Sequence, residues 1–124
     1  MESRLRAAAH VIALLVCLEL TAFADPDPAL SSAGTADDWM KIGLARYDAG
    51  DWKGAVDAFT VGNGLDPRPQ FLFAIAQAER RRGNCRASVV YYQRFLATSP
   101  PAEQADAARE QLHRCEGSLV ATTP

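Results

Sequence analysis

The chain has 124 residues, a formal net charge of −2, and 48% hydrophobic and 23% charged residues. This composition is typical of one small globular domain, because two domains of half the length would bury too little surface to close a core. A net charge so close to zero argues against bulk electrostatic attraction to nucleic acid or to an anionic membrane.

Residues 1–24 have the three parts of a secretory signal peptide. Arg4 and Arg6 form a basic start, an apolar stretch follows, and residues 22–24 read Ala-Phe-Ala, the small-x-small end that a signal peptidase recognises. The sequence therefore predicts cleavage after Ala24 and a periplasmic or secreted mature protein.

Two other interpretations of this segment stay open. A retained, inner-membrane-anchored helix would place Glu19 in hydrocarbon, which costs about 2.5–3.5 kcal/mol on insertion scales. A lipoprotein signal would acylate Cys17, but Val16 stands where such a site has a small residue. After the apolar segment, residues 25–35 are rich in proline, serine, alanine and glycine, and they are predicted to form a flexible leader.

A repeat with a period of 33 residues begins at Ala36. When the chain is shifted by that period, large apolar residues coincide with large apolar ones, small with small, and helix breakers with helix breakers. Within each unit the apolar residues follow helical spacing, which is interrupted at Gly50 and at Gly83 and ends near Pro67 and near Pro100. The pattern predicts an antiparallel helix pair that is used twice.

The predicted fold class is therefore all-α, with repeats at residues 36–68 and 69–101 of a helical domain that spans residues 36–116. Small side chains allow the two helices of a pair to approach closely, and aromatic side chains fill the space beside them. The predicted core positions are Trp39, Ile42, Gly43, Ala55 and Phe59 in the first unit, and Leu72, Ile75, Ala76, Ser88 and Tyr92 in the second.

The units resemble the tetratricopeptide repeat family, whose pattern is W-x₂-L-G-x₂-Y, a glycine turn, A-x₃-F and a closing proline. Trp39, Ile42 and Gly43 match the opening, and Ala55 matches the small residue four positions before the aromatic. The tyrosine is displaced by one residue, to Tyr47, and the second unit matches more loosely.

This resemblance implies a short right-handed solenoid in which the first helix of each pair lines a concave, protein-binding face. The asparagine and lysine pairs that clamp a peptide carboxylate in some members of the family are absent. The residues that the resemblance places on this face are Met40, Leu44, Tyr47 and Asp48, followed by Phe73, Gln77, Arg80 and Arg81.

Residues 102–116 are predicted to form a fifth helix that caps the array. Its apolar stripe faces the repeats and its charged residues face outward, as a terminal cap requires. Residues 117–124 are predicted to form a flexible tail after Gly117. The stripe consists of Ala105, Ala108, Leu112 and Cys115.

Two cysteines, Cys85 and Cys115, remain after signal removal. They are expected at adjoining ends of antiparallel helices, within reach of each other, and an even number of cysteines in an exported chain favours a disulfide. The alternatives are a metal pair, for which only His113 is a nearby further ligand, or a redox couple, whose cysteines are usually closer in sequence.

No catalytic constellation is visible, because His113 is the sole histidine left after signal removal. We therefore expect a non-enzymatic adaptor or scaffold that binds a protein or peptide, with no catalytic, cofactor or metal site and no nucleic-acid partner. His113 is interpreted as a solvated residue in the last turn of the cap helix.

Positive charge is concentrated in the second half of the chain, where Arg80–Arg82 and Arg86 form the densest basic patch. These arginines either complement the negative end of a helix or bind an acidic partner. Two alternative functions stay open. One is a self-assembly module whose repeat ends stack into oligomers, and the other is a membrane-anchored envelope assembly factor, if the signal segment is retained.

Overall fold

The structure is a computed structural model and describes residues 27–122. The predicted signal segment and its cleavage point after Ala24 lie outside the described residues. The chain divides into two compact units, residues 1–31 and residues 32–124, and each is described by itself. All regular secondary structure within residues 27–122 is helical, which confirms the all-α prediction.

A short helix, α2 (Pro28–Ser32), lies in the segment predicted to be a flexible leader. Proline fits the first position of a helix because its fixed φ suits the helix and its missing N–H has no partner there. The Leu30 N–H donates to the Asp27 carbonyl at 2.9 Å and closes the first turn. The predicted flexible leader, residues 25–35, therefore includes the short helix α2.

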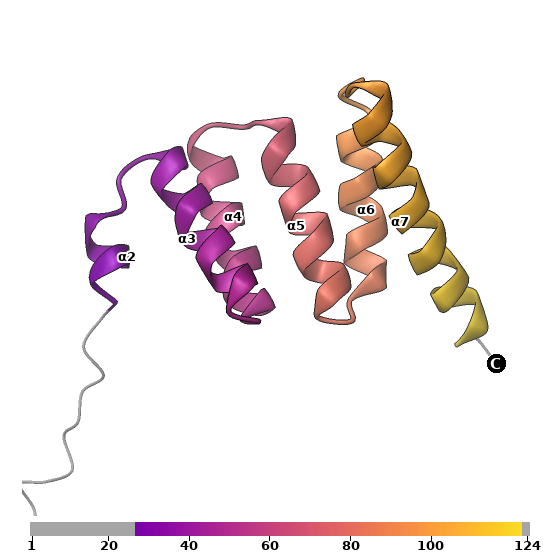
Figure 1. Cartoon of the computed structure of the whole chain (residues 1–124), viewed down its shortest axis with the longest axis horizontal. Coiled ribbons are helices and arrows are strands. Elements are labelled where there is room, and N and C mark those ends of the chain that lie inside the picture. The colour runs from indigo at the N-terminus through magenta and orange to yellow at the C-terminus, as the bar shows by residue number, and fades with distance from the viewer. Residues whose placement is uncertain (1–26, 123–124) are drawn as a thin grey trace, which may run out of the picture. The chain divides into compact units, whose positions relative to one another are not determined.

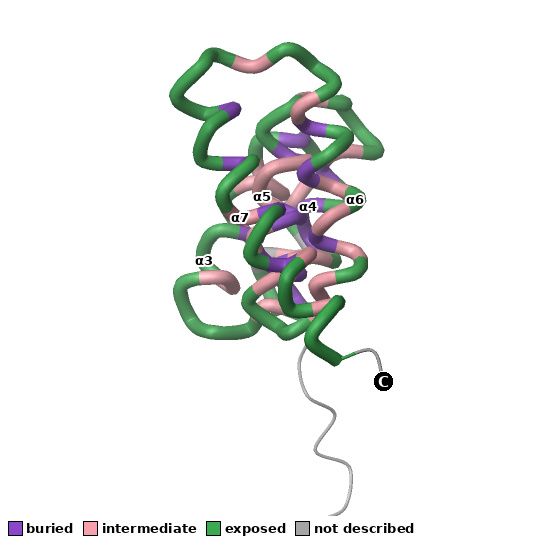
Figure 2. Tube along the Cα trace, turned by 90° about the vertical axis from the view of Figure 1, so that its right-hand side faces the viewer, coloured by how far each residue is buried: buried purple, intermediate pink, exposed green. Residues whose placement is uncertain are grey.

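The second unit is a row of helices, each packed on the next along the chain (Figure 1). Two antiparallel pairs, α3–α4 and α5–α6, are followed by α7. Figure 2 shows α4 and α6 on one side, and α3, α5 and α7 on the other. The helices are α3 (Ala36–Asp48), α4 (Trp52–Leu65), α5 (Pro69–Arg81), α6 (Cys85–Leu96) and α7 (Ala102–Ala121).

The turns inside the two pairs are built alike. Gly50 and Gly83 have φ of 79° and 85°, in the left-handed region that glycine adopts without a Cβ penalty. The next residue caps the following helix in each case: the Asp51 side chain accepts from a backbone N–H of α4, and the Asn84 side chain accepts from the Ala87 N–H. The two units of the repeat thus share the same turn, a glycine with positive φ followed by a residue whose side chain caps the next helix.

Helix α5 lies between two core clusters and contributes to both. Phe71, Ile75 and Ala78 belong to the cluster shared with α3 and α4, whereas Ala76 belongs to the cluster shared with α6 and α7. The remaining buried members are Ala36, Ala55 and Phe59 in the first cluster, and Tyr92, Phe95, Ala108 and Leu112 in the second.

The predicted core positions differ in their burial. Trp39, Ile42 and Leu72 are only half-buried. Phe71, which sequence reasoning missed, is fully buried instead of its neighbour Leu72, because its ring lies where a side chain on Gly62 would stand. The predicted positions that are buried are Gly43, Ala55, Phe59, Ile75, Ala76, Ser88 and Tyr92.

Helix α7 continues to Ala121, beyond the predicted end at residue 116. Gly117 does not end the helix, because a helical glycine costs only about 1 kcal/mol relative to alanine and helix-compatible residues follow it. Residues 117–121 of the predicted tail therefore belong to the helix. His113 therefore lies inside the helix and not in its last turn. Its side chain is exposed, and its Nδ1 lies 3.4 Å from Glu116 Oε2.

Candidate functional site

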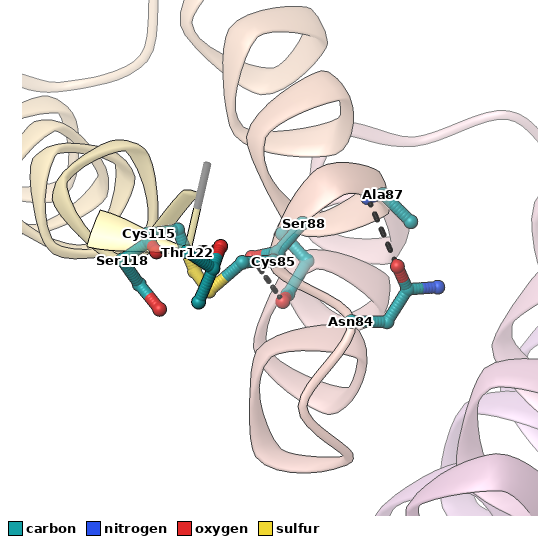
Figure 3. Close-up of a disulfide and its surroundings, with 8 residues drawn as sticks. Asn84, Cys85, Ala87, Ser88, Cys115, Ser118 and Thr122 are labelled. Carbon is teal, nitrogen blue, oxygen red and sulfur yellow. Dashed lines mark hydrogen bonds between the residues drawn. A yellow bond between two sulfur atoms is a disulfide. The ribbon is translucent and has the colours of Figure 1, made fainter. Parts of the chain in front are cut away.

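A disulfide joins Cys85, the first residue of α6, to Cys115 in α7 (Figure 3). The two Cα atoms are 5.0 Å apart, and 30 positions separate the cysteines in the sequence. Cys115 is buried, and Cys85 is half-buried beside the Asn84 cap. A disulfide is compatible with an oxidising compartment. No helix within the described range is both long and apolar enough to cross a membrane.

A hollow of about 150 Å³ lies between α5 and α7, above α6, and is lined by Gln70, Phe73, Phe95 and Gln104. A neighbouring hollow of about 280 Å³ shares three of these residues and extends over the α6–α7 turn, residues 97–101. We call the two hollows together, with the side chains that follow them along α5 and α7, the α5–α7 groove.

Aromatic rings form the floor of this groove. The Phe73 ring meets Tyr92 edge-on, with centroids 5.7 Å apart, and it meets Phe95 at a tilt, with centroids 5.1 Å apart. Phe73 is half-buried, so one side of its ring is covered by the core while the other faces the hollow. Offset and edge-on rings attract each other, which holds the floor in one arrangement.

The rim of the groove continues along both helices. Gln77 lies seven residues after Gln70 and Arg80 lies seven residues after Phe73, so each pair shares one face of α5. Gln111 lies seven residues after Gln104 and shares its face of α7 in the same way. The side chains that follow the hollow at Phe73 along both helices are therefore polar.

Three buried polar atoms, one each on α5, α6 and α7, make no hydrogen bond of good geometry within the protein: Arg80 Nε, Tyr92 Oη and Gln111 Oε1. Tyr92 is completely buried, and this burial raises the pKa of its hydroxyl. The neighbouring Arg80 guanidinium partly opposes the shift in that pKa, but it makes no hydrogen bond of good geometry with the hydroxyl.

Two further buried atoms also lack a hydrogen bond of good geometry, but each has an opposite charge beside it. Arg68 Nε is 3.2 Å from Asp66 Oδ2, and Glu79 Oε2 is 2.8 Å from Arg82 Nε. Among the described residues, the buried polar atoms without a hydrogen bond and without an opposite charge beside them are thus Arg80 Nε, Tyr92 Oη and Gln111 Oε1. Buried polar groups are normally satisfied, so these three need an explanation.

The three consecutive arginines of α5 and its cap point to three different neighbours. Arg80 lies beside Tyr92, Arg81 lies 5.2 Å above the Trp52 ring, and Arg82 pairs with the buried Glu79. The densest basic patch in the sequence is therefore not one surface with three free charges. Of the three, Arg80 lies on the face of α5 that lines the groove.

The predicted concave-face residues differ in their burial and surroundings. Met40 and Tyr47 are half-buried and pack against the first core cluster. Leu44, Asp48 and Arg81 are exposed. Phe73 from the predicted set lines the hollow between α5 and α7, and Gln77 and Arg80 follow it along α5.

Sequence reasoning missed the other groove residues: Gln70, Phe95, Gln104 and Gln111. A signal for them existed in the sequence, because glutamine recurs at an interval of seven in both α5 and α7. Such an interval places side chains on one helical face, and two helices with the same spacing suggest two walls of one site.

Neither a metal cluster nor a known relative accounts for the groove. Across the residues that the structure describes, no three His, Cys, Asp or Glu side chains converge as metal ligands would. Comparisons with protein-family models, curated proteins and solved structures found no match. The functional argument therefore depends on the geometry of this chain.

Proposed function

We propose that this protein is a non-enzymatic adaptor or scaffold that binds a segment of another protein, or a peptide, in the α5–α7 groove. The observation that carries the proposal is the apolar hollow over Phe73, rimmed by Gln70 and Gln104. Concave apolar sites with a few polar groups at the rim are the usual form of binding sites. Amides, aromatic rings and a guanidinium bind ligands but do not exchange protons readily at neutral pH.

We also propose that the helix pairs stack as a short right-handed solenoid of the tetratricopeptide type. The 33-residue period supports this, and so do the matching glycine turns at Gly50 and Gly83 and the matching caps at Asp51 and Asn84. In such an array α3, α5 and α7 line one face, and the groove lies on that face between α5 and α7.

Export from the cytoplasm is the third part of the proposal. The basic, apolar and small-x-small parts of residues 1–24 support a cleaved signal peptide. The disulfide supports a periplasmic or secreted location, because reducing compartments keep such pairs open. Intact-mass measurement of the exported protein tests this: a chain starting at Asp25 is expected, and retained residues 1–24 would favour the membrane-anchored alternative.

Photo-cross-linking tests binding in the groove. A benzoyl-phenylalanine at Gln104, on the rim, is expected to capture a partner in cells that produce the protein. The same group at Arg109, an exposed position on the same helix, is the matched control and is expected to capture none. The capture at Gln104 should be lost in a Gln70→Arg background, because a long charged side chain then stands at the hollow.

A self-assembly module is the second candidate, because several large apolar side chains of the first helix pair are exposed. Leu44 is 48% exposed on α3, and Val61 and Leu65, one turn apart on α4, are 42% and 55% exposed. Light scattering on the purified protein separates the two functions. An adaptor is expected to be monomeric, whereas a concentration-dependent oligomer without capture at Gln104 would contradict the adaptor and support stacking.

A further inference from the structure

We infer that the α6–α7 turn, residues 97–101, binds ligand as well as joining two helices, and that Ser99 makes the contact through its hydroxyl. The group that this hydroxyl meets is a neutral amide, next to an apolar side chain that fills the hollow over Phe73. This inference depends on the proposed binding function of the same groove and adds a residue of the site and the chemistry that it recognises.

Helix α6 is shorter than the repeat requires. Helices α4 and α6 begin at equivalent positions of the 33-residue period, Trp52 and Cys85. Helix α4 has 14 residues, whereas α6 has 12 and ends at Leu96. At the end of α4, the Asp66 N–H still donates four residues back, to the Gly62 carbonyl at 3.0 Å. The second unit therefore departs from the first where α6 ends.

The end of α6 is a tightened turn that leads into the hollow. The Thr98 N–H donates three residues back, to the Phe95 carbonyl at 3.0 Å. The Ser99 N–H does the same to the Leu96 carbonyl at 3.1 Å. Bonds of this kind tighten the last turn of a helix and end it. Thr98 and Ser99 leave the helix in this way, and both line the hollow of about 280 Å³.

Ser99 has an unfavourable backbone conformation. Its φ is 55°, in the left-handed region, and within residues 27–122 it is the one residue other than glycine with a positive φ. Asp66, the equivalent residue of the first unit, has a φ of −147°, the extended conformation that is usual before a proline. Glycine would adopt the left-handed conformation without a Cβ penalty, as Gly50 and Gly83 do. A serine at this strained position therefore points to a use for its side chain.

The hydroxyl of Ser99 is free to meet a ligand. The neighbouring Thr98 hydroxyl is already occupied, because it donates to the Phe95 carbonyl at 2.6 Å. Ser99 is exposed at the hollow, and no hydrogen bond to another described residue occupies its hydroxyl. A hydroxyl can donate one hydrogen bond and accept others, so it suits either side of an amide group.

The two hollows fit one large apolar side chain and the backbone beside it. The hollow over Phe73 measures about 150 Å³, the size of an apolar cavity that accepts benzene and stays dry when empty. The neighbouring hollow has the amides of Gln70 and Gln104 and the hydroxyl of Ser99, which together can donate to and accept from an amide. The side chains that line both hollows are uncharged, and a charge buried there without a partner would be costly. The ligand group that fits is therefore a neutral amide attached to an aromatic or branched aliphatic side chain.

N-acetylphenylalanine amide is the probe that tests this chemistry, because it has one aromatic side chain, amides on both sides and no charge. It is titrated into the isotope-labelled, disulfide-bonded protein and followed by NMR. The backbone amide resonances of Ser99 and Gln104 are expected to shift together, with one dissociation constant. N-acetylglycine amide, which lacks the ring, is the matched probe and should shift neither resonance at the same concentrations.

Two substitutions separate the hydroxyl of Ser99 from its backbone. Ser99→Ala removes the hydroxyl and keeps the Cβ, so it should weaken the probe about threefold to tenfold, as expected for one neutral hydrogen bond, without raising the melting temperature. Ser99→Gly also relieves the backbone, so it should weaken the probe by the same factor and raise the melting temperature by about 2–4 °C. Ser118→Ala, at an exposed position of α7, is the matched control and should leave the affinity unchanged.

The outcomes separate this inference from the function on which it depends. Full affinity in both Ser99 variants overturns the inference, because Ser99 is then only a strained connection. A loss of affinity in Ser99→Gly alone also overturns it, because the backbone and not the hydroxyl then matters. A probe that shifts neither resonance, or no better than the glycine probe, overturns the ligand chemistry, and capture at Gln104 then decides whether the adaptor stands. Loss of all capture at Gln104 overturns the proposed function itself.

Discussion

At two positions of the first helix pair, glycine is required because an aromatic ring packs against its Cα, not because of the backbone conformation. A Cβ on Gly43 would overlap the Phe59 ring, and a Cβ on Gly62 would overlap the Phe71 ring. Both glycines are helical and buried, so each pays the entropic cost of glycine in a helix. The gain is a fully buried ring against the helix backbone, which no side chain at the same position allows.

Gly43→Ala is therefore expected to destabilise the protein by about 1–3 kcal/mol, the usual cost of overpacking a core. Gly64→Ala is the matched control: it lies in α4 with nothing near its added Cβ, and should stabilise by up to about 1 kcal/mol through helix propensity. Urea denaturation measures both. Equal changes of the same sign in the two variants would contradict the role assigned to the Phe59 ring.

At the scale of single residues, the sequence predicts small side chains well and ring positions less well. Gly43 and Ala55 are recognisable because both repeats carry a small residue there. Phe71 is not recognisable, since Leu72 is the residue in register with Trp39. The choice between neighbours is made by Gly62, which lies on another helix and leaves room for only one ring.

At the scale of elements, the start of α3 is fixed by a reciprocal cap. The Asp38 N–H donates to Thr35 Oγ1 at 3.2 Å, and the Thr35 N–H donates to Asp38 Oδ2 at 3.0 Å. The Thr35 hydroxyl also donates to Asp38 Oδ2 at 2.8 Å. These donors, the hydroxyl first, lower the pKa of Asp38 below its ordinary value of 3.8.

The lowered pKa predicts how stability depends on acidity. A carboxyl whose folded pKa is depressed stabilises the fold above pH 3.8, and this contribution is lost as the pH falls through the folded value. Asp38→Asn should therefore be less stable than the native chain at neutral pH, and the gap should close in acid. Thermal melting across that range measures it, and a gap that stays constant contradicts the cap.

Element boundaries show where sequence reasoning stops. The four repeat helices are predictable, because glycine or proline stands between them and Asp51 and Asn84 are good caps. The end of α7 is not predictable, because a glycine such as Gly117 can either end a helix or lie within one. The Thr122 hydroxyl bonds the carbonyls of Ser118 and Leu119 near the true end, a contact that no pattern of residue types reveals.

At the scale of the second unit, the groove exists only while α7 is docked. Phe73 and Gln70 belong to α5, Phe95 to α6 and Gln104 to α7, so three helices must keep their places. The family resemblance predicts the α5 wall, because it names the first helix of each pair. It leaves out the second wall, because α7 is interpreted there as a cap and not as part of a site.

The disulfide is expected to hold that second wall in place. Two repeats are fewer than the three that helical repeat arrays usually need. We therefore expect that packing alone holds α7 in place with only a small margin of stability. Closing a loop of 30 residues stabilises by roughly 3–4 kcal/mol in chain-entropy terms, and losing a native disulfide typically costs about 2–5 kcal/mol. Cys115→Ser should lower the free energy of unfolding by that amount.

Binding and stability should then fall together. Urea denaturation gives the stability of Cys115→Ser, and photo-cross-linking from position 104 measures its binding. Cys85→Ser is the matched control, because it breaks the same bond from the other helix and should give the same losses, as should reduction of the native chain. A variant that loses stability but keeps full capture at position 104 would show that apolar packing of Ala108 and Leu112 against α6 is enough to keep α7 docked.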